Sequence, residues 1–271
     1  MVAPAVLLAT ILWVLPLVTV GGLSFFDSNL LRRAWVGFKN YVEIWGNPQW
    51  QMAVVNSFVY AGIMIVLGVG LGLLIALPAS GLSKRWQNGV RTSTYLPYLA
   101  AGVIIGQFWL WVFRNAGLAN YLVGLLGIAP QRWLGERWLA VPVIGFVVIM
   151  SVGCTNSVFL LAALEGVPKE LREAARMDGC GVVRTWFAVD VPFIWKMIVI
   201  EIFLAFVGGF GVWETPYMLT QGGPEGATAS TIYAIWTEAF TKQRYGIAAT
   251  ESIALLSLVA GVMFVVARVR K

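Results

Sequence analysis

Long apolar runs dominate the pattern along this chain, and short polar stretches separate them. Six runs are long enough to cross a bilayer, because a helix of about 20 residues spans the hydrocarbon core. The predicted spans are Val2–Phe26, Val54–Leu77, Thr92–Phe113, Leu139–Leu164, Pro192–Leu219 and Ile247–Ala267. The runs are continuously apolar rather than alternating, which favours helices over a transmembrane β-barrel. The pattern therefore predicts an all-α polytopic membrane protein of about six transmembrane helices, with residues 1–271 forming a single transmembrane domain.

One polar stretch is much longer than a simple turn requires. It is Glu173–Pro192, EAARMDGCGVVRTWFAVDVP, between the fourth and fifth runs. Its first part is charged and helix-forming, and Gly179 and Gly181 end that helix and permit a sharp reversal. A short apolar segment, Val182–Val189, then leads back to the fifth span. We predict a helix–turn–helix at the membrane surface over residues 165–192.

The purpose of this hairpin stays open on its pattern alone. The first helix is amphipathic, with small and apolar side chains on one face and charges around the rest. The residues of the apolar face are Leu164, Val167, Leu171, Ala174 and Ala175. Such a hairpin is suited to anchoring in lipid headgroups. It is equally suited to docking into a groove on a cytoplasmic partner.

The composition agrees with a chain embedded in lipid. Of its 271 residues, 59% are hydrophobic and 12% are charged, whereas soluble proteins carry about 25% charged residues. There is no histidine, and the two cysteines are Cys154 and Cys180. This argues against a disulfide framework and a histidine-ligated metal site. We therefore expect this chain to bind no metal or cofactor, and we interpret the cysteines as small packing residues.

The net charge of +6 comes from basic residues in the connections between spans. That placement favours contact with membrane lipid over nucleic-acid binding. Placing both termini in the cytoplasm puts the larger share of the 19 lysines and arginines inside, as the positive-inside rule requires. The same orientation puts Glu173–Pro192 inside the cell. The first run lacks the basic start of a signal peptide, so it is predicted to remain as a helix.

The hairpin resembles the EAA loop of binding-protein-dependent ABC importer permeases, whose pattern is Glu-Ala-Ala-x-x-x-Gly followed further on by an apolar residue and x-Pro. The matching residues are Glu173, Ala174, Ala175, Asp178, Gly179 and Pro192. Two positions depart mildly from the pattern. Cys180 stands where alanine is usual, and Val189 stands where isoleucine is usual.

The resemblance extends along almost the whole chain. VGFKNY at Val36–Tyr41 is similar to the first outer-loop motif of that family. LTQGGPEGAT at Leu219–Thr228 resembles the LT-x-GGP element of the sugar permease subunits in maltodextrin- and glycerol-phosphate-type systems. The partner permease of those systems usually lacks this element, so it indicates the carbohydrate branch.

The resemblance implies the ABC type I importer permease fold and an assembly of several chains. The partners would be a second homologous permease, two ATP-binding subunits and an extracellular or periplasmic solute-binding protein. The assembly would lie in a prokaryotic plasma (inner) membrane and import a mono-, di- or oligosaccharide. ATP and Mg²⁺ would be used by the partner ATPase. The chain itself has no Gly-x-x-x-x-Gly-Lys-Ser/Thr phosphate loop and no catalytic residue, so the matching hairpin residues would transmit force.

Two groups of polar residues in the spans are candidates for the substrate pathway. In the fifth span, Glu214 stands beside Trp213 and Tyr217, and aromatic rings next to a carboxylate suit a sugar. Alternatively, the rings belong to the headgroup belt and Glu214 is wetted at the span end. In the fourth span, Thr155 and Asn156 lie on the helix that contributes to the sugar site in the maltose-type relative. Hydrogen bonding between helices is the simpler explanation for them.

Two further carboxylates lie within predicted spans, where ionisable residues are functional candidates by default. Glu201 is expected to pair with Lys196, and Glu251 is expected to be solvated near the outer end of the sixth span. Both are interpreted as structural or gating residues.

Other functions remain as alternatives. Within the same family, the solute could be glycerol phosphate or another polyol-like compound. From a different class, an ion-coupled secondary transporter would need paired carboxylates, a basic relay and repeated halves, and neither histidine nor a repeat is visible. A membrane-embedded enzyme would need a nucleophile–base pair or a metal site. A non-transporting scaffold is the remaining alternative.

Overall fold

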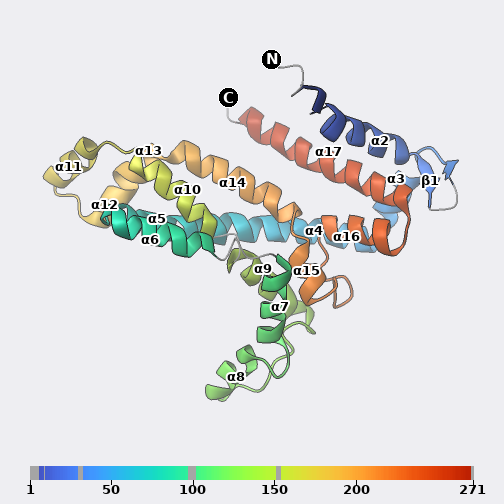
Figure 1. Cartoon of the computed structure of the whole chain (residues 1–271), viewed down its shortest axis with the longest axis horizontal. Coiled ribbons are helices and arrows are strands. Elements are labelled where there is room, and N and C mark those ends of the chain that lie inside the picture. Colours follow the sequence, from blue (N-terminus) through green and yellow to red (C-terminus); the bar gives the residue numbers. More distant parts are fainter. Residues whose placement is uncertain (1–5, 9, 30–32, 97–101, 151–153, 270–271) are drawn as a thin grey trace. The chain divides into compact units, whose positions relative to one another are not determined.

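The computed structural model describes residues 6–8, 10–29, 33–96, 102–150 and 154–269. Regular structure in these residues is helical apart from one short antiparallel hairpin, in which β1 (Phe26–Ser28) pairs with β2 (Arg33–Trp35). By its contacts the chain divides into two compact units, residues 57–228 and residues 1–56 with 229–271. Figure 1 shows the elements of both. The single domain expected over residues 1–271 stays a prediction.

Four of the six predicted spans are long apolar helical segments. They are Val6–Leu23, Pro48–Ser80, Trp195–Leu219 and Tyr245–Phe264. The third and fourth predicted spans each include residues outside the described part, at 97–101 and 151–153. Their described parts are four helices, α6 (Lys84–Tyr95), α7 (Gly102–Phe113), α9 (Arg137–Val148) and α10 (Cys154–Glu165).

The larger unit is built around the second and fifth spans. The second span consists of α4 (Pro48–Ile63), the π-helical η2 (Met64–Val69) and α5 (Gly70–Ser80). The fifth consists of α14 (Trp195–Phe210) and α15 (Glu214–Leu219). The helix α10 packs against α5, α6 and α14, and α15 packs against α7 and α9. The short α8 (Leu118–Leu125) follows α7.

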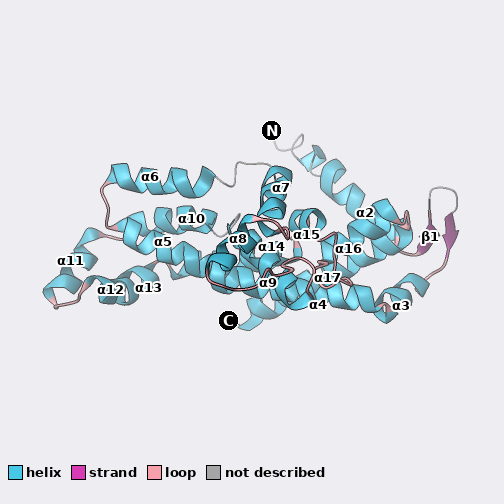
Figure 2. Ribbon diagram, turned by 90° about the horizontal axis from the view of Figure 1, so that it is seen from below, coloured by secondary structure: helices cyan, strands magenta, loops and turns pink. Residues whose placement is uncertain are grey.

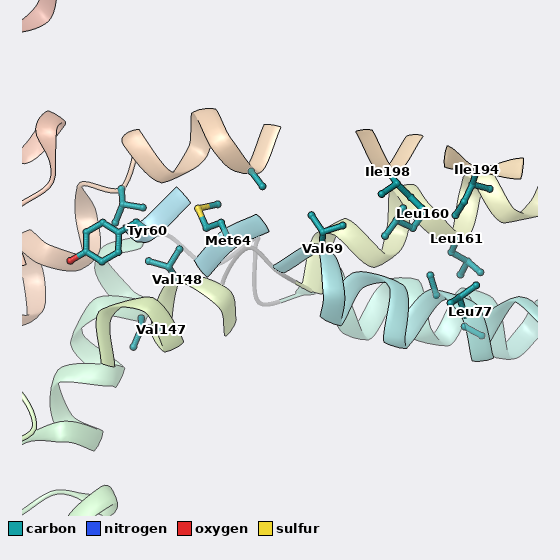
Figure 3. Close-up of a cluster of buried hydrophobic side chains, with 14 of the residues drawn as sticks. Tyr60, Met64, Val69, Leu77, Val147, Val148, Leu160, Leu161, Ile194 and Ile198 are labelled. Atoms are coloured by element: carbon teal, nitrogen blue, oxygen red, sulfur yellow. The ribbon is translucent and has the colours of Figure 1, made fainter. Parts of the chain in front are cut away.

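Buried aliphatic side chains hold this unit together. At one end of the cluster, Leu160 and Leu161 of α10 meet Leu77 of α5 and Ile194 and Ile198 near the start of α14 (Figure 3). Each is at most 6% exposed. Between helices in a membrane such contacts stabilise through close packing, and they fix α10 against α5 and α14. The hairpin that follows α10 is therefore attached to a rigid base.

Small residues let two pairs of helices approach closely in this unit. A Cβ added at Gly72 of α5 would lie 3.0 Å from Asn156 Cβ of α10. A Cβ added at Gly209 of α14 would overlap the backbone of Ala61 in α4 and lie 2.6 Å from Ala61 Cβ. Close packing at small residues stabilises helix pairs in membranes, where dispersion contacts replace the hydrophobic effect. Glycine is therefore required sterically at Gly209, whereas at Gly72 a side chain would make a tight contact that α10 has to relieve by a small shift.

The smaller unit joins the first and sixth spans to the connection between the first two spans. Its helical elements, besides the first part of α4, are η1 (Thr10–Val14), α2 (Leu15–Leu23), α3 (Lys39–Gly46), α16 (Thr231–Trp236), η6 (Thr237–Thr241) and α17 (Tyr245–Val269). The amide of Asn40 donates to the carbonyl oxygens of Ser24 and Phe26, each at 2.9 Å. The hydroxyl of Thr250 donates to the same Ser24 oxygen at 3.0 Å. These bonds fasten α3 and α17 to the end of α2.

Candidate functional site

The segment predicted as a helix–turn–helix has that structure. The first arm is α11 (Lys169–Met177), and the second is α12 (Val182–Thr185) with η5 (Trp186–Asp190) and α13 (Val191–Phe193). In two views, α11 lies beyond the ends of α5, α6 and α10 (Figures 1 and 2). We refer to residues 165–192 as the coupling hairpin, after the role that the resemblance predicts for it.

The turn of the coupling hairpin is closed by backbone hydrogen bonds. The N–H of Gly179 donates to Arg176 O at 3.0 Å, and the N–H of Cys180 donates to Ala175 O at 2.9 Å. This is the Schellman arrangement that commonly ends an α-helix. It places Gly179 at φ +78°, in the left-handed region that side chains with a Cβ disfavour. Gly181, in contrast, has φ −68°, which any residue adopts.

The amphipathic face predicted for α11 is only partly buried. Leu164, Val167 and Ala175 are buried, whereas Leu171 is 46% exposed and Ala174 is exposed as well. The predicted face did not specify what covers it, and Ala175 is the buried residue of α11. Of the two alanines in the motif, Ala175 thus lies inside the hairpin and Ala174 on its outer surface.

The outer surface of the coupling hairpin carries both charged and apolar side chains. Glu173, Asp178 and Pro192 are exposed. The exposed apolar residues around them are Leu171, Met177, Val182, Val183 and Phe187, and Met177 is 88% exposed. Exposed apolar side chains beside charged ones suit either a partner protein or lipid headgroups.

A buried ion pair holds the two arms together. Arg172 Nε lies 2.7 Å from Asp190 Oδ1, and an Nη atom of Arg172 donates to the carbonyl oxygen of Leu164 at 3.3 Å. Asp190 is 1% exposed. Neither residue was predicted as functional from the sequence. A signal was present, because Asp190 is a lone acid between Val189 and Val191 and a buried carboxylate needs a partner.

A second charged group lies at the base of the coupling hairpin. Glu165, the last residue of α10, pairs with Lys84 at 2.5 Å and with Arg91 at 2.8 Å, both on α6. Hydrogen bonds from Lys84 and Arg91 hold the pKa of Glu165 below its ordinary value. Glu165 therefore remains ionised at neutral pH and ties α6 to α10.

The aromatic candidates of the fifth span lie together. The rings of Trp213 and Tyr217 stack with their centroids 5.1 Å apart and their planes 13° apart. Glu214, the first residue of α15, is exposed beside them. The arrangement therefore brings together aromatic faces and hydrogen-bond acceptors at one place in the fifth span.

The candidates of the fourth span lie elsewhere in the same unit. Thr155 is 6% exposed, and Asn156 is half-buried where α10 meets Gly72 of α5. Since α15 packs on α7 and α9, the described contacts do not bring the two groups of candidates together. Asn156 thus lies at a packing contact between α10 and α5, and both its role in the pathway and hydrogen bonding between helices stay predictions.

The two other carboxylates differ from what was expected. Among the described residues, Glu201 forms no ion pair with Lys196, and the side chain of Glu201 is 2% exposed. Glu251 is 1% exposed rather than solvated. It is buried because α17 continues past Glu251 and its first turns pack against β1 and α3. Within the described part of the chain, no group of three or more His, Cys, Asp or Glu residues is placed to hold a metal ion.

Comparison with known proteins places these features in a family. Residues 68–271 match the family model described as "Binding-protein-dependent transport system inner membrane component". The probable ABC transporter permease protein YurN of Bacillus subtilis is 31% identical over 230 residues, covering 83% of this chain and 78% of that protein. The diacetylchitobiose uptake system permease protein NgcF of Streptomyces coelicolor is 29% identical, covering 86% and 70%.

Two further comparisons concern solute and fold. The sn-glycerol-3-phosphate transport system permease protein UgpA of Brucella abortus is 28% identical, covering 96% of this chain and 89% of that protein. A bacterial ABC transporter involved in the import of the acidic polysaccharide alginate has a chain that matches with a TM-score of 0.83. That match is 21% identical and covers 99% of this chain and 94% of the other, so it shows a shared fold.

Proposed function

Because this chain belongs to the family of binding-protein-dependent transport system inner membrane components, we propose that its coupling hairpin is the surface through which separate ATPase subunits drive it. The observation that carries the proposal is the exposed surface of Glu173, Ala174 and Asp178 on a helix that ends at a Schellman turn. Small and charged side chains on a rigid arm permit a close fit to a groove.

The chain is a permease component of an ABC importer and not an enzyme. Its fold is that of importer permeases, as the resemblance predicted. The alternatives of an ion-coupled transporter and a membrane-embedded enzyme are therefore dropped. The partner ATPase would use the ATP and Mg²⁺.

The proposed solute is a carbohydrate. Relatives are named for the uptake of diacetylchitobiose, arabinooligosaccharides and sn-glycerol-3-phosphate. A neutral sugar is favoured over a phosphate ester because Trp213 and Tyr217 stack beside an acidic residue, Glu214. An anionic solute would instead need cationic side chains, and the outer half of the fifth span, FLAFVGGFGVWETPYML, has none.

The proposed assembly contains a second homologous permease, two ATP-binding subunits and a solute-binding protein. A related transporter has a structure in complex with an alginate pentasaccharide-bound periplasmic protein, which supports the last of these partners. The assembly would lie in a prokaryotic plasma membrane with both termini of this chain in the cytoplasm. This orientation puts the coupling hairpin on the side where ATP is available.

Leucine in place of Ala174 is expected to weaken binding of the ATPase. The added side chain would stand on the exposed face of α11 and hold the partner away, without disturbing the hairpin interior. Overpacking costs about 1–3 kcal/mol, or a fall in affinity of about 5- to 150-fold. The measurement is the amount of ATPase that co-purifies with the tagged permease from membranes.

Ala162→Leu is the matched control, because Ala162 is exposed on α10 outside the coupling hairpin. It should retain the ATPase at the level of the unchanged protein. Full retention by Ala174→Leu would contradict docking at this surface.

Removing the stacked ring of Trp213 is expected to weaken transport of the sugar more than assembly. Trp213→Ala should raise the KM for transport about 2- to 10-fold, because stacking of a ring is worth about 0.5–1.5 kcal/mol beyond its area burial. The measurement is uptake of the cognate sugar into proteoliposomes, with ATPase co-purification as the assembly control. Trp213→Phe keeps a stacking ring, so its KM for transport should be close to that of the parent. An unchanged KM in both variants would place the substrate pathway elsewhere.

A further inference from the structure

Arg172 joins three segments at the inner surface of the coupling hairpin. It belongs to α11, it pairs with Asp190 of η5 at 2.7 Å, and it donates to the carbonyl oxygen of Leu164 in α10 at 3.3 Å. Its side chain is 21% exposed, whereas that of Asp190 is 2% exposed. One side chain thus connects the first arm, the second arm and the helix that precedes both.

The guanidinium of Arg172 holds its two acceptors in a fixed geometry. A guanidinium has several N–H donors in one plane, so it bonds two acceptors at once in a fixed geometry. A buried carboxylate without its partner is strongly unfavourable, which keeps Asp190 against Arg172. The two arms are therefore unable to separate, or to tilt away from the end of α10, without exposing a charge to an apolar surrounding.

The next residue along the chain continues these contacts. Glu165 follows Leu164 and binds Lys84 and Arg91 of α6. Ion pairs and one hydrogen bond to a carbonyl oxygen thus link the segments in series. Asp190 pairs with Arg172, Arg172 donates to Leu164 at the end of α10, and Glu165 pairs with α6.

We propose that Arg172 and Asp190 are positioning residues that make the coupling hairpin move as one rigid body with the end of α10. This inference rests on the proposed function, in which the ATPase displaces the hairpin. A hinge at the hairpin base would absorb that displacement. The Arg172 contacts prevent such a hinge from forming. Displacement of the hairpin is therefore passed to α10 and, through Glu165, to α6.

The rigidity of this connection is measurable without knowing the solute. In a cysteine-free background, spin labels are placed at Val183 on the second arm and Ala162 on α10, both exposed. The permease is purified with its ATPase, and the distance distribution is recorded without nucleotide and with MgATP and vanadate. The parent should give a narrow distribution with the same mean distance in both states.

Four variants test the roles of the two charges. Arg172→Gln leaves Asp190 buried without a cation, and the distribution should become about twofold broader or shift with nucleotide. Arg172→Lys keeps the charge but loses the planar set of N–H donors. The width of its distance distribution should lie between those of Arg172→Gln and the parent. Asp190→Asn should also broaden the distribution. The double variant Arg172→Gln/Asp190→Asn removes the unpaired carboxylate, so its effect should be smaller than the product of the two single effects.

Arg85→Gln is the charge control, because Arg85 is an exposed arginine of α6. It should leave the distribution unchanged. If Arg172→Gln does not accumulate in membranes, Asp190→Asn and the double variant carry the test, because neither leaves a buried unpaired carboxylate. The inference is overturned if the variants that accumulate keep the parent's narrow distribution in both states, or if the effects of the single variants multiply.

The two proposals fail separately. If the unchanged permease does not co-purify with the ATPase, the docking role of the coupling hairpin is contradicted. The width of the distance distribution would still be measurable in the permease alone. Retained ATPase binding and MgATP hydrolysis in Arg172→Gln, together with a broadened distribution, would show that the contacts transmit movement and are not needed for assembly.

Discussion

Valine in place of Gly179 is expected to lower transport by at least about fivefold while leaving membrane insertion intact. Gly179 adopts φ +78° at the Schellman turn. A β-branched residue held in the left-handed region costs about 1–3 kcal/mol, and each 1.4 kcal/mol is a tenfold change in population. The turn would open, and α11 would no longer be held against the second arm. The measurement is ATP-driven uptake into proteoliposomes, compared with the amount of permease in the membrane.

Two neighbouring substitutions separate backbone conformation from side-chain size. Asn tolerates the left-handed region better than other non-glycine residues, so Gly179→Asn should retain more transport than Gly179→Val. Gly181→Val adds the same side chain two residues further on, where φ is −68° and no atom lies within 4 Å of the added Cβ. It should transport nearly as well as the parent. Equal losses at the two glycines would refute the role assigned to the turn.

Alanine in place of Gly209 is expected to destabilise the larger unit by at least about 3 kcal/mol, the upper part of the range for overpacked cores. The added Cβ would overlap the backbone of Ala61. A backbone atom, unlike the end of a flexible side chain, moves only with its whole helix. The helices α4 and α14 would have to separate, and the cluster in Figure 3 would loosen with them. The fraction of monodisperse protein left after heating in detergent, measured by size-exclusion chromatography, reports the loss.

Gly62→Ala is the matched control for this substitution. Gly62 lies in the same pair of helices, is exposed and has no atom within 4 Å of the added Cβ. Alanine is favoured over glycine in a helix by about 1 kcal/mol, so the control should be at least as stable as the parent. If Gly209→Ala survives heating as well as Gly62→Ala does, the two helices do not pack as closely as described.

The sequence predicted the spans and the hairpin because their signals are local. A run of apolar residues defines a span without knowledge of its neighbours, and a glycine after an amphipathic segment defines a helix end. The bounds agree within several residues for the second and sixth spans. The turn at Gly179 is the clearest case, since the residue type and the backbone angle agree.

The errors concern which neighbour a side chain meets. Glu251 was assigned to solvent, because a pattern gives the face of a helix but not the element that covers it. The Arg172–Asp190 pair joins residues 18 positions apart in the chain. No periodicity relates them, so only the folded hairpin brings them into view.

The closure of the coupling hairpin by backbone bonds has an evolutionary consequence. The turn depends on the N–H groups of Gly179 and Cys180, and the interior on Ala175 and the Arg172–Asp190 pair. None of these uses the exposed side chains of Glu173, Ala174 or Asp178. The fold of the hairpin therefore does not constrain those positions. Only the proposed contact with the ATPase does, so substitutions there would change the choice of ATPase while the shape of the hairpin is inherited unchanged.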